Sequence, residues 1–148
     1  MDKMKADWWL VPFEEYAKRL RPFARLTVQE VAAEAIKPTV VAAQTMKTEG
    51  DRLLQALPED GFVIALERTG SPLSSEALAE LMRSEGEGGR PLVFVVGGAA
   101  GLDPAVLQRA NKKVTLSAMT FTHEMARVIL AEQLYRAVTI LAGKTYHY

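Results

Sequence analysis

The chain has 148 residues, of which 49% are hydrophobic and 24% are charged, a composition typical of a folded globular protein. Its 18 basic side chains balance its 18 acidic ones, which argues against a domain that holds free nucleic acid by charge alone. It contains no cysteine and only two histidines, which excludes disulfides, zinc–thiolate sites and cysteine nucleophiles and predicts no metal site.

The N-terminal third gives one clear helix and several weaker patterns. Residues 12–20 predict a helix because their apolar side chains recur at helical spacing, and Pro12 suits its first turn. Residues 25–31 alternate in polarity as a strand does. Residues 32–43 fit neither pattern, and residues 44–57 predict a second helix.

The remainder alternates regularly between strands and helices. Strands are predicted at residues 62–66, 92–96 and 114–116. Helices are predicted at residues 74–84, 104–111 and 123–142, with a glycine-rich loop at 85–90. Asp103 and Thr122 are the predicted N-caps of the last two helices, and Gly143 is the predicted terminator. The order αβαβαβαβα predicts one α/β domain over residues 1–148, with a mostly parallel sheet and helices on both faces.

The last helix is apolar on most of its sides. A helix of this kind has to be covered on more than one side. Because the chain is short, we expect the second cover to be another copy of the protein, which predicts a homodimer through the C-terminal helix. No secretory signal or membrane span is recognisable, so we expect a cytoplasmic protein without a membrane partner.

Two segments indicate a ligand pocket. The strand at 92–96 runs into the glycine turn Gly97–Gly101, and the segment 116–121 follows the next strand. Glycine lets a ligand approach the backbone, and open α/β sheets bind ligands at the carboxyl ends of their strands. The pair favours a pocket made largely of main chain and suited to a flat, polar-edged cofactor. Taken alone, Gly97-Gly98 is equally a tight turn from strand to helix.

Several ordered motifs carry a resemblance to a known family. They are residues 14–20, 63–67, Gly70, 73–76, 94–102, 116–121, His123, 127–128, 132–137 and 146–147. In order and spacing these residues resemble the RlmH family, SPOUT-class methyltransferases that methylate N3 of a pseudouridine in bacterial large-subunit (23S) ribosomal RNA. The family begins with a further strand that ends in a Val-Gly-Lys-like turn, whereas this chain begins at Met1-Asp2-Lys3-Met4. Either the usual first strand is missing or the start site of this chain is misassigned.

The resemblance implies a trefoil-knotted fold, a homodimer and S-adenosylmethionine as cofactor. By position it implies that the cofactor is bound by residues of three segments. They are Leu66, Gly98, Leu116, Ser117, Ala118, Met119, Thr120 and Phe121. The partners it implies are the ribosome and its 23S rRNA, and we expect no DNA partner.

The candidate catalytic residues are His123, His147, Tyr146 and Arg127. His123 begins a helix, where the dipole disfavours a charged imidazole, so it is our first candidate to take the imide proton; the alternative is a surface histidine. Tyr146 and His147 either fold over the pocket, with Tyr146 stacked on the base, or belong to a frayed tail. Arg127 is a candidate phosphate contact or a surface arginine.

A basic cluster lies at the end of the first helix, formed by Lys18, Arg19, Arg21 and Arg25. It is either a phosphate-facing patch or a solvated helix end. Because the net charge is zero, we expect an assembled ribosome to present the substrate. Two alternatives stay open beside the methyltransferase for N3 of pseudouridine: a non-catalytic ribosome- or RNA-binding SPOUT-like domain, and a methyltransferase for another RNA base.

Overall fold

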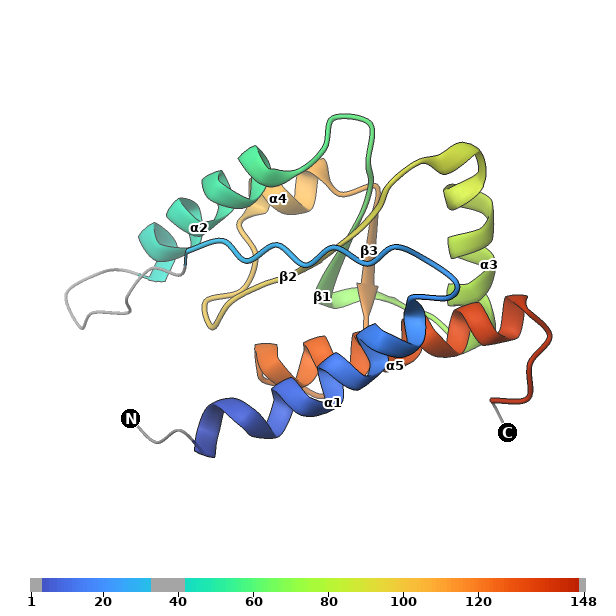
Figure 1. Ribbon diagram of the computed structural model, residues 1–148. Helices are drawn as coiled ribbons and strands as arrows, with labels where there is room; N and C mark the ends of the chain where they lie inside the picture. The colour runs from blue at the N-terminus through green and yellow to red at the C-terminus, as the bar shows by residue number, and fades with distance from the viewer. Residues whose placement is uncertain (1–3, 33–41, 147–148) are drawn as a thin grey trace.

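The computed structural model describes residues 4–32 and 42–146, and side chains from Trp8 onward. The elements are α1 (Met4–Leu20), α2 (Ala42–Ala56), β1 (Phe62–Pro72), α3 (Ser75–Gly86), the 3-10 turn η1 (Glu87–Gly89), β2 (Leu92–Val96), α4 (Pro104–Arg109), β3 (Lys112–Thr115) and α5 (His123–Leu141) (Figure 1). The described strands form a parallel sheet in the order β2-β1-β3. This confirms the predicted α/β fold with a mostly parallel sheet.

The central strand β1 distributes its side chains to two cores, because successive residues of a strand point to opposite faces. Ile64 packs with residues of α3, α5 and β3 on one face. Val63 and Ala65 pack on the other face with α2 and α4. Helices therefore cover both faces of the sheet, as predicted, with α2 and α4 on one side and α3 and α5 on the other (Figure 1).

Side-chain oxygens cap three helices at their N-termini, and two of these caps, Asp103 and Thr122, are the predicted ones. The backbone N–H of Ala77 donates to Ser74 Oγ at 3.1 Å, and that of Ala105 donates to Asp103 Oδ1 at 2.8 Å. The N–H of Met125 donates to Thr122 Oγ1 at 3.3 Å, which caps α5. At the far end of α5, Gly143 takes a φ of 64°, the left-handed conformation that ends many helices.

The predicted strand at 25–31 is wrong. These residues run as an extended segment across the sheet in Figure 1 but pair with none of the described strands. Alternating polarity specifies a strand only where a neighbouring strand supplies hydrogen bonds and one face is buried. Here Leu26 and Val28 are exposed, so neither condition is met. Most of the ambiguous segment, residues 33–41, lies outside the described residues.

The first helix begins at Met4 rather than at Pro12, which lies inside α1. Proline removes a helical hydrogen bond and normally marks a helix start. The turn before it packs against α5, because Trp9 and Phe13 both lie under the guanidinium of Arg127. This contact between α1 and α5 outweighs the preference of proline for the first turn of a helix.

Smaller differences concern the ends of elements. Strand β1 extends to Pro72, beyond the predicted end at residue 66, and its pairing with β3 shifts register between Leu66 and Ser71. Strand β3 begins at Lys112 and ends at Thr115, earlier than predicted. The predicted loop at 85–90 instead continues α3 to Gly86 and then forms η1.

The C-terminal helix is covered by elements of its own chain. Helix α5 contacts α3 on the sheet side and α1 on the other, and Figure 1 shows α1 running beside it. We expected a second copy of the protein to cover the remaining apolar surface of α5. Helix α1 of the same chain covers part of that surface instead. The homodimer, the trefoil knot and the single domain over residues 1–148 stay predictions. None of the described helices is long and apolar enough to cross a membrane.

Candidate functional site

A cavity of about 770 Å³ lies at the carboxyl ends of the strands. Its walls are the segment 66–68 of β1, the segment 96–102 after β2, and residues between 115 and 126 after β3. In a parallel sheet these ends meet at one edge, so segments far apart in sequence converge there. The structure thus brings together both segments that the sequence marked as ligand-binding.

The residues predicted to bind a cofactor line this cavity, with one exception. Those that line it are Leu66, Gly98, Leu116, Ser117, Met119, Thr120 and Phe121. Ala118 lies in the same loop but is exposed and does not contribute a wall. Met119 is 71% exposed, so this loop presents an apolar side chain at the cavity rim.

The glycine turn is tightly closed on itself. The N–H of Gly101 donates to the carbonyl of Gly98 at 3.1 Å, and Gly101 has a φ of 87°. A Cβ on Gly97 would lie 3.0 Å from the carbonyl carbon of Gly101. The two arms of the turn therefore approach each other closely, and glycine main chain forms part of the cavity wall here.

The loop after β3 is held by its own hydroxyl groups. Thr115 Oγ1 donates to the carbonyl of Ser117 at 2.7 Å. The N–H of Met119 donates to Ser117 Oγ at 3.0 Å. These local bonds hold the loop in a fixed shape, and Leu116 and Phe121 of the same loop line the cavity.

His123 lines the cavity at the first turn of α5. Its side chain is 46% exposed, and its Nε2 lies 2.9 Å from Glu124 Oε1. Side chains of both charges line the same cavity, namely Glu67, Arg68 and Glu124. An exposed imidazole at a cavity rim can reach a ligand without a large rearrangement of the chain.

Arg127 is one turn further along α5 and does not line the cavity. Its guanidinium carbon lies 4.6 Å from the centre of the Trp9 ring and 5.3 Å from that of Phe13. Its Nη1 is 2.7 Å from Glu30 Oε1. Arg127 thus joins α5 to α1 and to the extended segment 24–32, and within this chain its charge is already paired.

Tyr146 packs against the middle of α5, away from the cavity. Its ring meets Tyr135 edge-on at 4.7 Å, and its hydroxyl lies 3.4 Å from both Tyr16 and Glu132. Burial, followed by the hydrogen bond with Tyr16, raises the pKa of Tyr146 to about 12. Glu132, which Tyr146 contacts, follows His123 by nine residues on α5. This spacing corresponds to about 14 Å along the helix axis. His147 lies outside the described residues.

Some cavity residues were not predicted. Glu67 and Arg68 line it directly after the predicted strand 62–66, and Glu124 lines it beside His123. The first two could have been found from their place after a buried parallel strand. Glu124 gives no such signal, because an acidic residue in the first turn of a helix is favourable whatever its function. No group of three or more His, Cys, Asp or Glu side chains in the described ranges is arranged to hold a metal ion.

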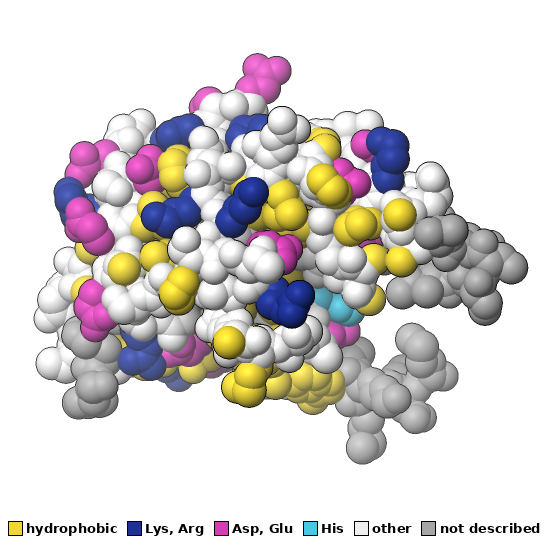
Figure 2. Space-filling model, turned by 180° about the vertical axis from the view of Figure 1, so that it is seen from behind, with side chains coloured by type: hydrophobic (Ala, Val, Ile, Leu, Met, Phe, Trp, Pro, Cys, Tyr) yellow, Lys and Arg dark blue, Asp and Glu magenta, His cyan; other side chains and the backbone are white. Residues whose placement is uncertain are grey.

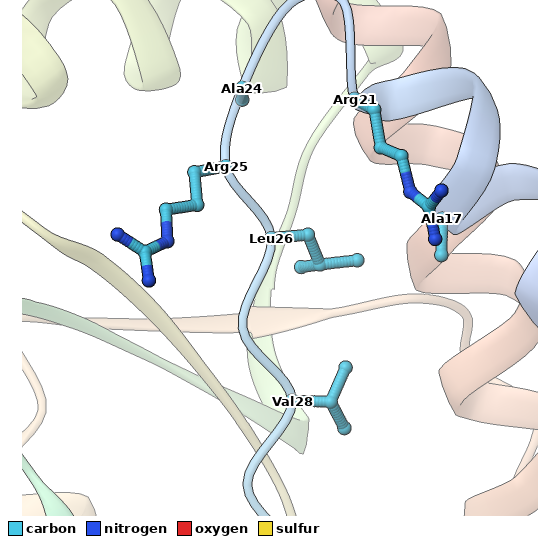
Figure 3. A pocket seen from close by; sticks show the side chains of 6 residues that line it. All are labelled: Ala17, Arg21, Ala24, Arg25, Leu26 and Val28. Atoms are coloured by element: carbon cyan, nitrogen blue, oxygen red, sulfur yellow. The ribbon is translucent and has the colours of Figure 1, made fainter.

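A second hollow, of about 410 Å³, lies between the end of α1 and the segment 24–28. Figure 3 shows that Arg25 points away from Leu26 and Val28, whereas Arg21 lies along α1. Its arginines therefore do not converge on one point. In the same basic cluster, Arg19 Nε is bonded to Glu15 at 2.7 Å. Within this cluster, Arg19 is thus paired with Glu15, and Arg21 and Arg25 point in different directions.

Comparison with known proteins agrees with this architecture. A family model described as "Predicted SPOUT methyltransferase" matches residues 1–147. A protein of Halothermothrix orenii named ribosomal RNA large subunit methyltransferase H is 41% identical over 98% of this chain and 94% of its own length. Proteins of the same name from Symbiobacterium thermophilum and Bifidobacterium animalis are 43% and 44% identical, again over 98% of this chain and 94% of theirs.

These matches cover nearly the whole chain, including the cavity segments 66–68, 96–102 and 115–126. The chain therefore belongs to the SPOUT methyltransferase family, among the proteins named ribosomal RNA large subunit methyltransferase H.

Proposed function

We propose that the protein transfers a methyl group from S-adenosylmethionine to N3 of a pseudouridine in large-subunit (23S) ribosomal RNA. The cavity at the carboxyl ends of β1, β2 and β3 is the observation that carries this proposal. It joins a glycine turn, an apolar loop and a histidine in one place. The names of the relatives support ribosomal RNA as the substrate class.

The residues of the cavity fit this cofactor. Leu66 and Leu116 offer apolar surface for a flat base, and the main chain of Gly97–Gly101 offers donors and acceptors for its edge. The volume of about 770 Å³ lies within the range of small-molecule sites. When bound, the cofactor supplies a methyl group on a positively charged sulfur. The role of these residues is to hold and orient it toward the nucleophilic nitrogen.

We assign His123 as the general base that accepts the imide proton of the pseudouridine. It lies at the cavity rim, exposed enough to meet a nucleotide that enters from solvent. A ring nitrogen of an imidazole can accept a proton, which suits general-base catalysis. The carboxylate of Glu124 beside Nε2 limits how the ring can turn and favours one orientation.

The ribosome is the proposed partner. The chain has zero net charge, and Figure 2 shows basic and acidic side chains interspersed on the face that carries His123. Such a surface attracts free RNA weakly, because phosphate contacts supply most of the non-specific affinity. Recognition of an assembled particle fits better, and we place the protein in the cytoplasm, where ribosomes work. Efficient methylation of an isolated RNA hairpin would argue against this choice.

We also propose a homodimer through α5. Met125, Val128 and Ile129 on this helix are only partly buried by α1 and α3, and Trp8 and Val11 on α1 are 50% and 65% exposed. Within one chain, Tyr146 is well separated from His123, so the two can share a site only if Tyr146 comes from a partner. Sedimentation at micromolar concentration tests this, and a stable monomer would contradict it.

The function itself is tested with tritiated S-adenosylmethionine and ribosomes from a strain that lacks the modification. We expect label in large-subunit rRNA, at a single pseudouridine once mapped. Ribosomes that already carry the modification are the matched control and should remain unlabelled. Absence of label, with the cofactor bound in calorimetry, would favour a catalytically silent RNA-binding relative. Label at another base would favour the alternative that the protein methylates a different RNA base.

A further inference from the structure

Strand β1 bulges out of register at the edge of the cavity. Leu66 and Ser71 are both paired with Val114 of β3, so residues 67–70 are extra on the β1 side. The pairing of β1 with β2 also ends at Leu66. The segment 67–70, which we call the β1 bulge, is therefore fixed by the sheet at both of its ends. Bulges occur often beside functional sites, where they redirect a side chain.

Arg68 is the exposed charged residue of the β1 bulge. Both Glu67 and Arg68 line the cavity, but Glu67 is partly buried whereas Arg68 is exposed. The backbone N–H of Thr69 donates to Glu67 Oε1 at 3.4 Å, and a Cβ on Gly70 would lie 2.6 Å from backbone atoms of Val114. These contacts hold the bulge on either side of Arg68, and neither of them uses the Arg68 side chain.

Among the described residues that line the cavity, Arg68 is the only lysine or arginine. The carboxylates beside it are engaged, because Glu124 lies 2.9 Å from His123 Nε2 and Glu67 accepts from the main chain. The Arg68 side chain makes no hydrogen bond, ion pair or ring contact within the described part of the chain. A guanidinium is a permanent cation with several N–H donors, so this side chain is available to an anionic ligand.

A phosphate group is the anion that the proposed substrate brings to this rim. The backbone of an RNA strand carries a phosphate on each side of the nucleotide whose base enters the cavity. A guanidinium binds phosphate through two parallel N–H···O bonds, which adds geometric specificity to the attraction of charge. Most of the cofactor's contacts are assigned to the glycine turn and to the loop 116–121, whereas Arg68 belongs to a third segment and faces solvent, from which the RNA arrives.

We propose that Arg68 binds a phosphate of the RNA backbone beside the target pseudouridine and thereby holds the nucleotide in front of His123. Arg68 and His123 reach the same cavity from different elements, β1 and α5, so together they fix the nucleotide at its backbone and at its base. Contacts to phosphate position a nucleic acid without reading its sequence. This inference rests on the proposed function, since RNA is the substrate assigned to the cavity. Arg68 lies between the motifs 63–67 and Gly70, and none of the sequence motifs indicated it.

The test compares Arg68→Gln with Arg83→Gln. Both remove one positive charge from an exposed arginine, but Arg83 lies on α3 outside the cavity and pairs with the neighbouring Glu80 and Glu87 at 2.6 Å each. With ribosomes that lack the modification, R68Q should raise the KM for ribosomes roughly tenfold, as expected for a lost bond to a charged group. The R83Q variant should have the KM of the unchanged protein. Equal increases in the two variants would overturn the proposal.

Salt dependence tests whether the ligand of Arg68 is a phosphate. Filter binding of unmodified ribosomes is measured at several KCl concentrations and a fixed Mg²⁺ concentration. Each phosphate contact contributes about 0.7–0.9 to the slope of log affinity against log salt concentration, so the slope for R68Q should be shallower by about this amount. Arg68→Lys keeps the charge without the planar fork, so it should keep the slope and recover part of the KM. An unchanged slope for R68Q would overturn the proposal.

Calorimetry with S-adenosylmethionine separates a contact to RNA from a contact to the cofactor. R68Q should bind the cofactor as tightly as the unchanged protein does. If its affinity for the cofactor falls while its KM for ribosomes stays the same, Arg68 binds the carboxylate of the cofactor and the proposal is overturned. If the unchanged protein does not methylate ribosomes, the proposed function fails. If it does, and R68Q has the same KM and salt dependence, only this inference fails.

Discussion

Gly70 of β1 packs directly on the backbone of Val114 in β3: a Cβ on Gly70 would lie 2.6 Å from both the nitrogen and the carbonyl carbon of Val114. This contact falls where β1 shifts its register against β3, between Leu66 and Ser71. Because the two backbones approach each other this closely, β1 can continue past the cavity and pair with β3 again at Ser71. A glycine that looks like a strand terminator in the sequence is thus a point of close backbone approach.

Replacement of Gly70 by alanine should destabilise the protein strongly. Neither neighbouring atom belongs to a flexible side chain, so the two strands have to separate. We expect the free energy of unfolding to fall by roughly 1–3 kcal/mol or more, measured by denaturant titration. The control is Gly86→Ala, because a Cβ there meets only the side chain of Leu92, with Cδ1 at 3.6 Å and Cγ at 4.0 Å. Equal effects of the two substitutions would contradict this reading of the crossing.

Arg127 should stabilise the attachment of α1 to α5. Its substitution by alanine removes the stacking on Trp9 and Phe13 together with the pair to Glu30, and we expect a loss of roughly 1–2 kcal/mol in unfolding free energy. Glu30→Gln removes only the exposed ion pair and should cost less than about 1 kcal/mol. If Arg127→Ala leaves stability unchanged but raises the KM for ribosomes, Arg127 is the phosphate contact that the sequence suggested.

The raised pKa of Tyr146 predicts a loss of stability at high pH. Its folded-state pKa of about 12 exceeds the ordinary value of 10.0, so the folded chain holds the phenolic proton more tightly than the unfolded chain. Stability is therefore fully present below pH 10 and falls as pH rises toward 12. Denaturant unfolding across this range should show the decline, and Tyr146→Phe should flatten it. An equal decline in both proteins would assign it to other groups.

Removal of the His123 imidazole should affect turnover more than cofactor binding. His123→Ala and His123→Gln are expected to lower kcat by roughly 10²–10⁴, the usual contribution of a general base. Calorimetry should show a nearly unchanged affinity for S-adenosylmethionine, because the cofactor's main contacts are assigned to the glycine turn and the loop 116–121. Equal losses of turnover and affinity would indicate that His123 has a structural role.

Local chemistry made part of the fold predictable. Asp103 and Thr122 cap the helices they were expected to cap, because each side-chain oxygen needs only a backbone N–H group two or three residues away. The buried strands at 62–66 and 92–96 were recognisable from continuous apolar runs, and their carboxyl ends indicated where a cavity would form. The sequence by itself thus determined the fold class and most of the candidate site.

Long-range contacts decided the rest. The segment 25–31 alternates like a strand but has no strand beside it, and Pro12 lies within a helix that Arg127 holds from another element. Only the folded chain packs Gly70 on the backbone of Val114, and only it separates Tyr146 from His123. Periodicity and capping are properties of neighbouring residues, whereas these relationships depend on which distant surfaces meet, and a pattern along the chain does not encode that.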